Sequence, residues 1–117
     1  MTSFKKRNSL QNRIKESSRI LSKYSNRIPI IVERIPNTKN VPKIDRNKFL
    51  VPSDLSMGQF LYVIRKRLKL DPYKSIYLFV KDTVLIPSCE IMSNIYDNYK
   101  DDDQFLYISY TGENTFG

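Results

Sequence analysis

The sequence predicts an α+β fold in which a helix crosses one face of a mixed β-sheet. Short segments rich in β-branched and aromatic residues are typical of strands, and they alternate with segments whose apolar residues recur every three or four positions, as in helices. The chain has 117 residues with eight tyrosines and six phenylalanines but only three glycines. This length and composition predict one compact domain with a real core.

The charge and the missing residue types exclude several classes of protein. With no histidine and one cysteine, Cys89, neither a disulfide framework nor a structural zinc site nor a Ser-His or Cys-His catalytic pair can form. No glycine-rich phosphate loop and no apolar run of membrane-spanning length is present. We therefore expect no enzyme, no catalytic residue, no metal and no cofactor, and we expect Cys89 to be a packed cysteine near a helix N-terminus.

The net charge of +8 is unevenly distributed. Residues 1–27 carry +7 and residues 28–70 carry +6, whereas residues 71–117 carry −5. This asymmetry indicates either a solvated basic face or a partner of negative charge that faces the first part of the chain.

The first elements are a helix and a strand. Leu10, Ile14, Ile20 and Tyr24 have the spacing of an amphipathic helix over residues 10–24, while residues 1–8 are expected to be mobile or a short helical turn. The mostly β-branched segment from Arg27 to Ile35 predicts a strand, and the turn residues at 36–42 predict a loop.

The next stretch predicts a strand joined firmly to a helix. The apolar run at 48–51 stops at Pro52, which predicts a strand at the edge of a sheet. Ser56 and Gln59 have the spacing of a capping box, and Leu55 and Phe60 that of a hydrophobic staple. The helix is expected to end before residues 71–72.

The remaining elements complete the order. Residues 75–80 predict a buried strand, residues 84–86 a short return strand, residues 88–100 a helix capped by Ser88, and residues 105–110 the last strand. Short connections favour parallel pairing of the first and last strands. This order predicts a ubiquitin-like β-grasp with a four-stranded mixed sheet. The expected divisions are a helical extension (1–26), a core (27–110) and a flexible conjugation tail (111–117).

Several separated segments also resemble one known family. In order, they are Tyr24–Glu33, Lys48–Leu55, Gly58–Phe60, Ile64–Arg67 and Phe105–Tyr110. They resemble the ubiquitin-like autophagy modifiers, which are the GABA-receptor-associated and microtubule-associated light-chain proteins of animals and their yeast relative. The tail at 112–117 looks most like the yeast form. The resemblance implies two N-terminal helices on a ubiquitin-like core.

The resemblance implies a chemistry at the end of the chain. The carboxylate of Gly117 would be adenylated by an activating enzyme, passed to conjugating enzymes as a thioester, and joined to the amino group of phosphatidylethanolamine. Phe116 would be an apolar handle for these enzymes and for a deconjugating cysteine protease. The protein would then be cytoplasmic and peripheral on autophagosome membranes, with the vacuole, the lysosome and other organelles as further candidates. Tubulin is a further partner that the family suggests.

The resemblance also implies a groove for autophagy receptors that carry an aromatic-x-x-aliphatic motif flanked by acids. The peptide would add as a strand beside residues 48–51. The residues themselves support this, because alternation puts Phe49 and Val51 on one face of the strand and Lys48 and Leu50 on the other. The aromatic pocket would be Glu16, Ile20, Pro29, Lys48, Leu50 and Phe105; the aliphatic pocket Phe49, Val51, Pro52, Leu55, Phe60 and Val63; and the acid-attracting residues Arg27, Arg46, Lys48 and Arg67.

Two other functions fit the sequence. One is a ubiquitin-like adaptor domain that binds peptides and is never conjugated. The other is a basic nucleic-acid-binding domain, because the basic runs at 5–7 and 65–67 and the many tyrosines would suit phosphate contacts and stacking. The aromatic residues lie mostly in predicted core strands, so no nucleic-acid partner is expected.

Overall fold

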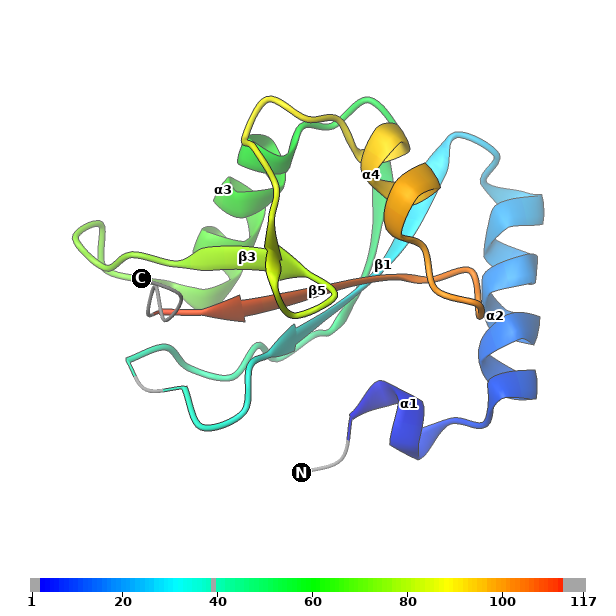
Figure 1. Cartoon of the computed structure of the whole chain (residues 1–117), viewed down its shortest axis with the longest axis horizontal. Coiled ribbons are helices and arrows are strands. Elements are labelled where there is room, and N and C mark those ends of the chain that lie inside the picture. The colour runs from blue at the N-terminus through cyan, green and yellow to red at the C-terminus, as the bar shows by residue number, and fades with distance from the viewer. Residues whose placement is uncertain (1–2, 39, 113–117) are drawn as a thin grey trace.

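A five-stranded mixed sheet forms the centre of the computed structural model, which describes residues 3–38 and 40–112 (Figure 1). The strands lie in the order β2-β1-β5-β3-β4, with β1 and β5 parallel and the other neighbours antiparallel. The predicted parallel pairing is therefore confirmed. The strands are β1 (Arg27–Arg34), β2 (Lys48–Pro52), β3 (Tyr77–Val80), β4 (Val84–Leu85) and β5 (Leu106–Thr111).

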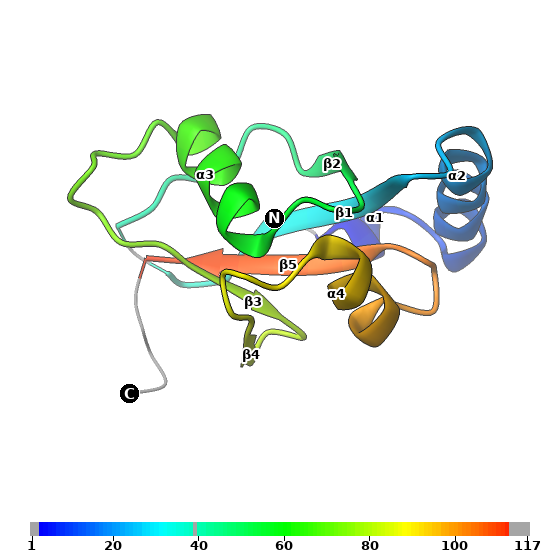
Figure 2. The same cartoon turned by 90° about the horizontal axis from the view of Figure 1, so that it is seen from above.

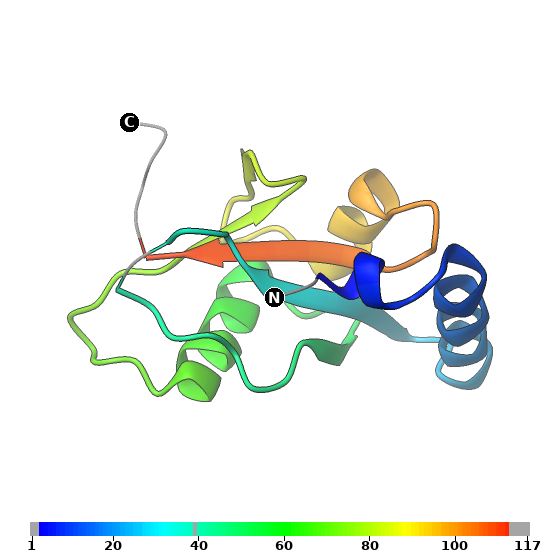
Figure 3. The ribbon, with the colours of Figure 1, turned by 90° about the horizontal axis from the view of Figure 1, so that it is seen from below.

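Four helices surround this sheet within the described ranges. They are α1 (Phe4–Arg7), α2 (Leu10–Lys23), α3 (Met57–Leu68) and α4 (Met92–Tyr99). Helices α3 and α4 lie over one face (Figure 2), α1 crosses the opposite face (Figure 3), and α2 stands across the end of the sheet where β1 begins.

Alternation along β1 divides the core in two. Ile28, Ile30 and Val32 join the main core beneath α3 and α4. Ile31 points the other way and packs with Phe4 and residues of α2 and β5 in a smaller cluster. Because β1 is buried on both faces, its sequence is a nearly continuous apolar run. Its second face packs against Phe4 of α1 and Ile20 of α2.

Helix α3 follows β2 through the predicted capping box. The side chain of Ser56 accepts from the N–H of Gln59, and the Gln59 side chain accepts from the N–H of Ser56. Leu55 and Phe60 both pack in the main core. The helix ends because Lys69 adopts a left-handed conformation, two residues before the predicted stop at Asp71.

Four predictions need correction. The sheet has five strands rather than four, because the short segment expected at 84–86 pairs with β3 over Val84–Leu85. Helix α4 begins at Met92 and not after Ser88, because residues 87–90 form a turn that accepts hydrogen bonds from the first residues of α3. Cys89 therefore lies in this turn, where it is exposed and not packed. Thr111, assigned to the tail, is the buried last residue of β5.

Candidate functional site at the β2 edge

Strand β2 is an edge of the sheet and exposes backbone groups. The N–H of Val32 donates to the carbonyl of Asn47, which fixes the alternation of the antiparallel ladder. Residues 47, 49 and 51 therefore bond to β1, and the N–H and C=O groups of Lys48 and Leu50 point away from the sheet. Pro29 faces Leu50 in a pair that needs no N–H donor from β1. An added strand would meet these outward groups first.

A hollow of about 230 Å³ lies beside this edge, between β2 and α2. Its apolar part includes Ile20 of α2, Leu50 of β2 and Phe105, the residue before β5. Leu50 is 36% exposed although it is a large apolar side chain. The complete lining is Arg19, Ile20, Lys23, Tyr24, Arg46, Lys48, Phe49, Leu50 and Phe105.

The rim of this hollow is positively charged. Four of its lining residues are cations, and among the described residues that line it there is no carboxylate. Lys48 pairs with Glu16 of α2, and its ammonium group also lies 5.6 Å from the centre of the Phe4 ring. An apolar hollow with a cationic rim suits an aromatic side chain carried on an acidic segment.

The floor of the hollow is closely packed. Phe105 is fully buried, and its ring packs edge-to-face on that of Phe4, with the centroids 5.4 Å apart. The backbone N–H of Phe4 donates to Glu33 at 2.8 Å. Helix α1 therefore supports the floor from below and fixes its depth.

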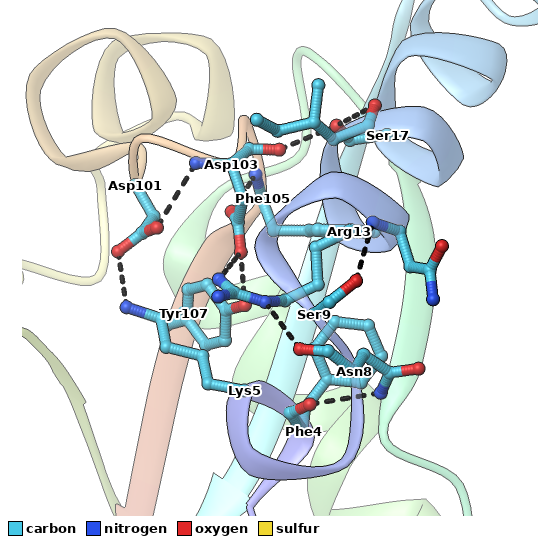
Figure 4. Close-up of polar contacts among 12 residues, drawn as sticks. Phe4, Lys5, Asn8, Ser9, Arg13, Ser17, Asp101, Asp103, Phe105 and Tyr107 are labelled. Atoms are coloured by element: carbon cyan, nitrogen blue, oxygen red, sulfur yellow. Dashed lines mark hydrogen bonds and ion pairs between the residues drawn. The ribbon is translucent and has the colours of Figure 1, made fainter.

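A buried carboxylate holds α2 against the sheet (Figure 4). Asp103, whose side chain is 0% exposed, pairs with Arg13 at 2.7 Å and accepts from the hydroxyl of Tyr107 and the N–H of Phe105. Ser17 of α2 donates to the carbonyl oxygen of Asp103 at 2.6 Å. These bonds join α2 to the turn before β5, two residues before Phe105, which lines the hollow.

The surroundings of Arg13 and Tyr107 shift the pKa of each side chain so that both stay protonated and can donate to Asp103. The hydrogen bond to Asp103 raises the pKa of the Arg13 guanidinium, against the effect of burial. Burial raises the pKa of Tyr107, and donation to Asp103 raises it further. Tyr107 therefore remains a hydrogen-bond donor throughout the physiological pH range.

The residues predicted for an aliphatic pocket lie mostly on the α3 side of β2. The rings of Phe49 and Phe60 pack edge-to-face with centroids 5.7 Å apart, and Val51 is buried beside them. Leu55 is half-buried, and Val63 on α3 is exposed. Pro52 is exposed, but alternation puts it on the same face as Leu50.

The structure changes the membership of the predicted aromatic pocket. Ile20, Lys48, Leu50 and Phe105 line the hollow. Glu16 instead pairs with Lys48, and Pro29 is a buried residue of β1 that is not among the lining residues. The sequence reading missed Arg19, Lys23 and Tyr24, although their spacing with Ile20 on one face of α2 was a signal for them.

The predicted acid-attracting residues have different surroundings. Arg46 and Lys48 line the hollow. Arg67 pairs with the exposed Asp45 at 3.1 Å. Arg27, the first residue of β1, donates to the carbonyl oxygen of Leu50 at 3.3 Å. Arg27 thus contacts the edge of β2 itself.

A larger hollow of about 820 Å³ lies elsewhere, beside the end of β1 and the loop that follows it. Its lining mixes three cations with three carboxylates: Arg7, Arg34, Lys43, Glu33, Asp45 and Asp82. This lining has no net charge to select a ligand of one sign, and it includes none of the residues predicted for the two pockets.

The sheet order, the helix that crosses it and the open β2 edge define a ubiquitin-like protein with an N-terminal helical extension. The family model "Autophagy protein Atg8 ubiquitin like" matches residues 12–117. The chain belongs to this Atg8 family of ubiquitin-like autophagy proteins. None of the helices within the described ranges is long and apolar enough to cross a membrane.

Individual relatives agree with this assignment. The chain is 57% identical over 116 residues to Autophagy-related protein 8A of Oryza sativa subsp. indica, covering 99% of this chain and 96% of that protein. It is 56% identical over 117 residues to Autophagy-related protein 8d of Arabidopsis thaliana, covering 100% and 96%. The crystal structure of ATG8 from Trypanosoma brucei superposes with a TM-score of 0.89 at 39% identity, covering 100% of this chain and 99% of that one.

Proposed function

We propose that this protein is a ubiquitin-like modifier that recruits autophagy receptors through the β2 edge. The observation that carries the proposal is the outward backbone of Lys48 and Leu50 beside an apolar hollow with a cationic rim. A peptide that adds as a strand obtains main-chain hydrogen bonds from the first feature and a side-chain pocket from the second.

The aromatic-x-x-aliphatic pattern fits the two faces of β2. Side chains three positions apart in a strand point to opposite faces. The aromatic anchor would enter the hollow on the α2 side, near Leu50 and Phe105. The aliphatic anchor would lie on the α3 side, near Phe49, Leu55 and Val63. Acids flanking the motif would meet Arg46 and Lys48 at the rim.

Peptide binding to a Leu50→Ala variant tests this groove. An acidic aromatic-x-x-aliphatic peptide, titrated by calorimetry, should lose at least about tenfold in affinity, which is about 1.4 kcal/mol. Leu85→Ala is the matched control, because Leu85 is an exposed leucine on β4, the opposite edge of the sheet. Equal affinity of the two variants, or steep salt-dependent binding to generic RNA with no peptide binding, would overturn the proposal.

The second part of the proposal is conjugation through Gly117 to phosphatidylethanolamine. Phe116 and Gly117 lie outside the described residues, so this part is supported by family membership and by the chemistry of the tail. Glycine has no side chain to block the approach of its carboxylate to an enzyme. The partners would be the activating and conjugating enzymes and the deconjugating protease. The protein itself would supply no catalyst, and the lipid would hold it on autophagosome membranes.

Reconstitution with the two enzymes and phosphatidylethanolamine vesicles tests conjugation. The wild-type protein should give a faster-migrating band in the membrane fraction, and Gly117→Ala should not. If the variant is lipidated equally, or if the wild type is never lipidated while it still binds the peptide, the protein is an adaptor that is not conjugated.

A further inference from the structure

The edge of β2 is already partly occupied within the chain. Only two residues of β2 before Pro52, Lys48 and Leu50, have carbonyl groups directed away from β1. Arg27 donates its Nη1 to one of them, the carbonyl oxygen of Leu50, at 3.3 Å. An added strand needs this same oxygen as an acceptor for its own N–H group.

The position of Arg27 follows from the local fold. Helix α2 ends where the N–H of Tyr24 donates to Ile20, and the N–H of Arg27 then donates to the carbonyl of Tyr24 at 3.1 Å. Arg27 pairs with Pro52 across the ladder, so its side chain lies on the same face as Leu50, one diagonal position away. The turn after α2 therefore delivers the guanidinium to the open edge.

We propose that Arg27 caps the Leu50 carbonyl in the free protein and thereby makes the groove selective for peptides that carry an acid. A peptide without an acid must displace the guanidinium and gives it no new partner except water. A peptide with an acid displaces it and offers a carboxylate, which forms a stronger, charge-assisted hydrogen bond. Arg27 is thus a specificity-determining residue, because it lowers the affinity of the groove for peptides without an acid.

This inference rests on the proposed peptide function and differs from simple charge attraction in one consequence. If Arg27 only attracts acids, its removal leaves the affinity for a neutral peptide unchanged. If it caps the edge, its removal increases that affinity, because the binding-competent form becomes the main one.

The experiment compares two peptides on three proteins by calorimetry. The peptides share one aromatic-x-x-aliphatic motif, with aspartate flanks in one and asparagine flanks in the other. The proteins are the wild type, Arg27→Met, which keeps the length of the side chain without a donor, and Arg46→Met. Arg46 is an exposed cation at the rim of the same hollow, so Arg46→Met controls for lost charge.

Capping predicts that the neutral peptide binds Arg27→Met about three- to tenfold more tightly than it binds the wild type, the range of one exposed hydrogen bond. Arg46→Met should weaken the acidic peptide and leave the neutral peptide unchanged. An unchanged or weaker affinity of the neutral peptide for Arg27→Met overturns the inference while the acidic peptide still binds the wild type. If neither peptide binds the wild type, the proposed function fails and the inference fails with it.

The free protein offers an independent measurement. The carbonyl carbon of Leu50 should shift upfield in the nuclear magnetic resonance spectrum of Arg27→Met, because a carbonyl that loses a hydrogen bond is less polarised. The carbonyl of Lys48 serves as the internal reference on the same edge. Equal shifts at both positions, or no shift at Leu50, would show that Arg27 does not cap it.

Discussion

At the scale of single residues, neighbouring side chains of the same type have very different energetic roles. Asp102 and Asp103 lie side by side, but Asp102 is exposed whereas Asp103 is fully buried with three partners. A charge is tolerated in the core only when it is paired and hydrogen-bonded, and removing one side of such a pair leaves the other uncompensated. From the sequence, the run of three acids at 101–103 predicts a solvated turn, and this prediction is wrong for Asp103.

Replacing Asp103 by alanine should therefore lower the free energy of unfolding by about 3 kcal/mol. The variant removes the carboxylate that accepts from Arg13, the Tyr107 hydroxyl and the Phe105 N–H, and leaves Arg13 only the carbonyl oxygen of Asn8. Urea unfolding followed by circular dichroism measures the change. Asp102→Ala is the matched control and should stay within about 0.5 kcal/mol of the wild type. Equal losses in the two variants would show that the buried network does not stabilise the fold.

At the scale of elements, the two helices on the main face begin in different ways. Helix α3 has a complete capping box, whereas α4, which begins at Met92, has Ile91 as its N-cap residue and no side-chain cap. The N–H of Met92 donates instead to the carbonyl of Leu55, so the turn before α3 completes the start of α4. Tertiary contact thus replaces a local signal.

Ser56→Ala should cost about 1 kcal/mol of stability, the usual value of a helix cap. Ser88→Ala, at the position where the sequence predicted a second cap, should cost under about 0.5 kcal/mol, because Ser88 is exposed and precedes the helix by four residues. Thermal unfolding of the two variants under one condition makes the comparison. A larger loss for Ser88→Ala would contradict the assigned start of α4.

The same comparison shows where sequence reasoning works in this fold. Periodicity and caps are local, so they located β1, β2 and α3 closely and indicated the edge at Pro52. The start of α4 depends on contacts with residues 55–58, more than thirty positions away, and no local pattern records them. The lining of the hollow was predicted only in part. The alternation of apolar residues predicted the contribution of β2, but the contribution of Arg19 and Tyr24 depends on where α2 lies relative to the sheet, which no local pattern records.

The attachment of α1 should depend on pH. Burial by itself would raise the pKa of Asp101, but the hydrogen bonds from Lys5 and from the N–H of Asp103 outweigh it and hold that pKa below its ordinary value. The pair therefore stabilises the fold above the unfolded pKa of about 3.9, and this contribution is lost as the pH falls through the lower, folded value.

Unfolding free energies of the wild type and Asp101→Asn measure this dependence. The wild type should be more stable by about 0.5–1 kcal/mol at pH 6, the value of a partly exposed pair. The two curves should converge once the pH falls below the folded pKa of Asp101, where the carboxylate is protonated in both states. A difference that persists at low pH would assign the effect to packing and not to charge.

At the scale of the whole molecule, the two proposed activities lie at opposite ends of one strand. Phe105, the residue before β5, lines the hollow beside α2, and β5 ends at Thr111 at the other end. A rise of about 3.3 Å per residue puts these ends about 20 Å apart. Figure 1 shows α2 and the last residues of β5 at opposite ends of the sheet. Strands β1 and β3 pair with β5 between these ends, but none of the described residues that line the hollow follows Phe105 in the chain.

We therefore expect peptide recognition to be independent of the tail. Deleting residues 113–117, or replacing Gly117 by alanine, should change the dissociation constant of the acidic peptide by less than about twofold, because coupling between two sites requires a contact that differs between two states. Calorimetry on the three proteins at one salt concentration measures this. Thermodynamic reciprocity then requires that bound peptide leave the equilibrium properties of the tail unchanged. A change of tenfold would mean that the two ends of β5 are linked, and that the receptor and the lipid do not bind as separate events.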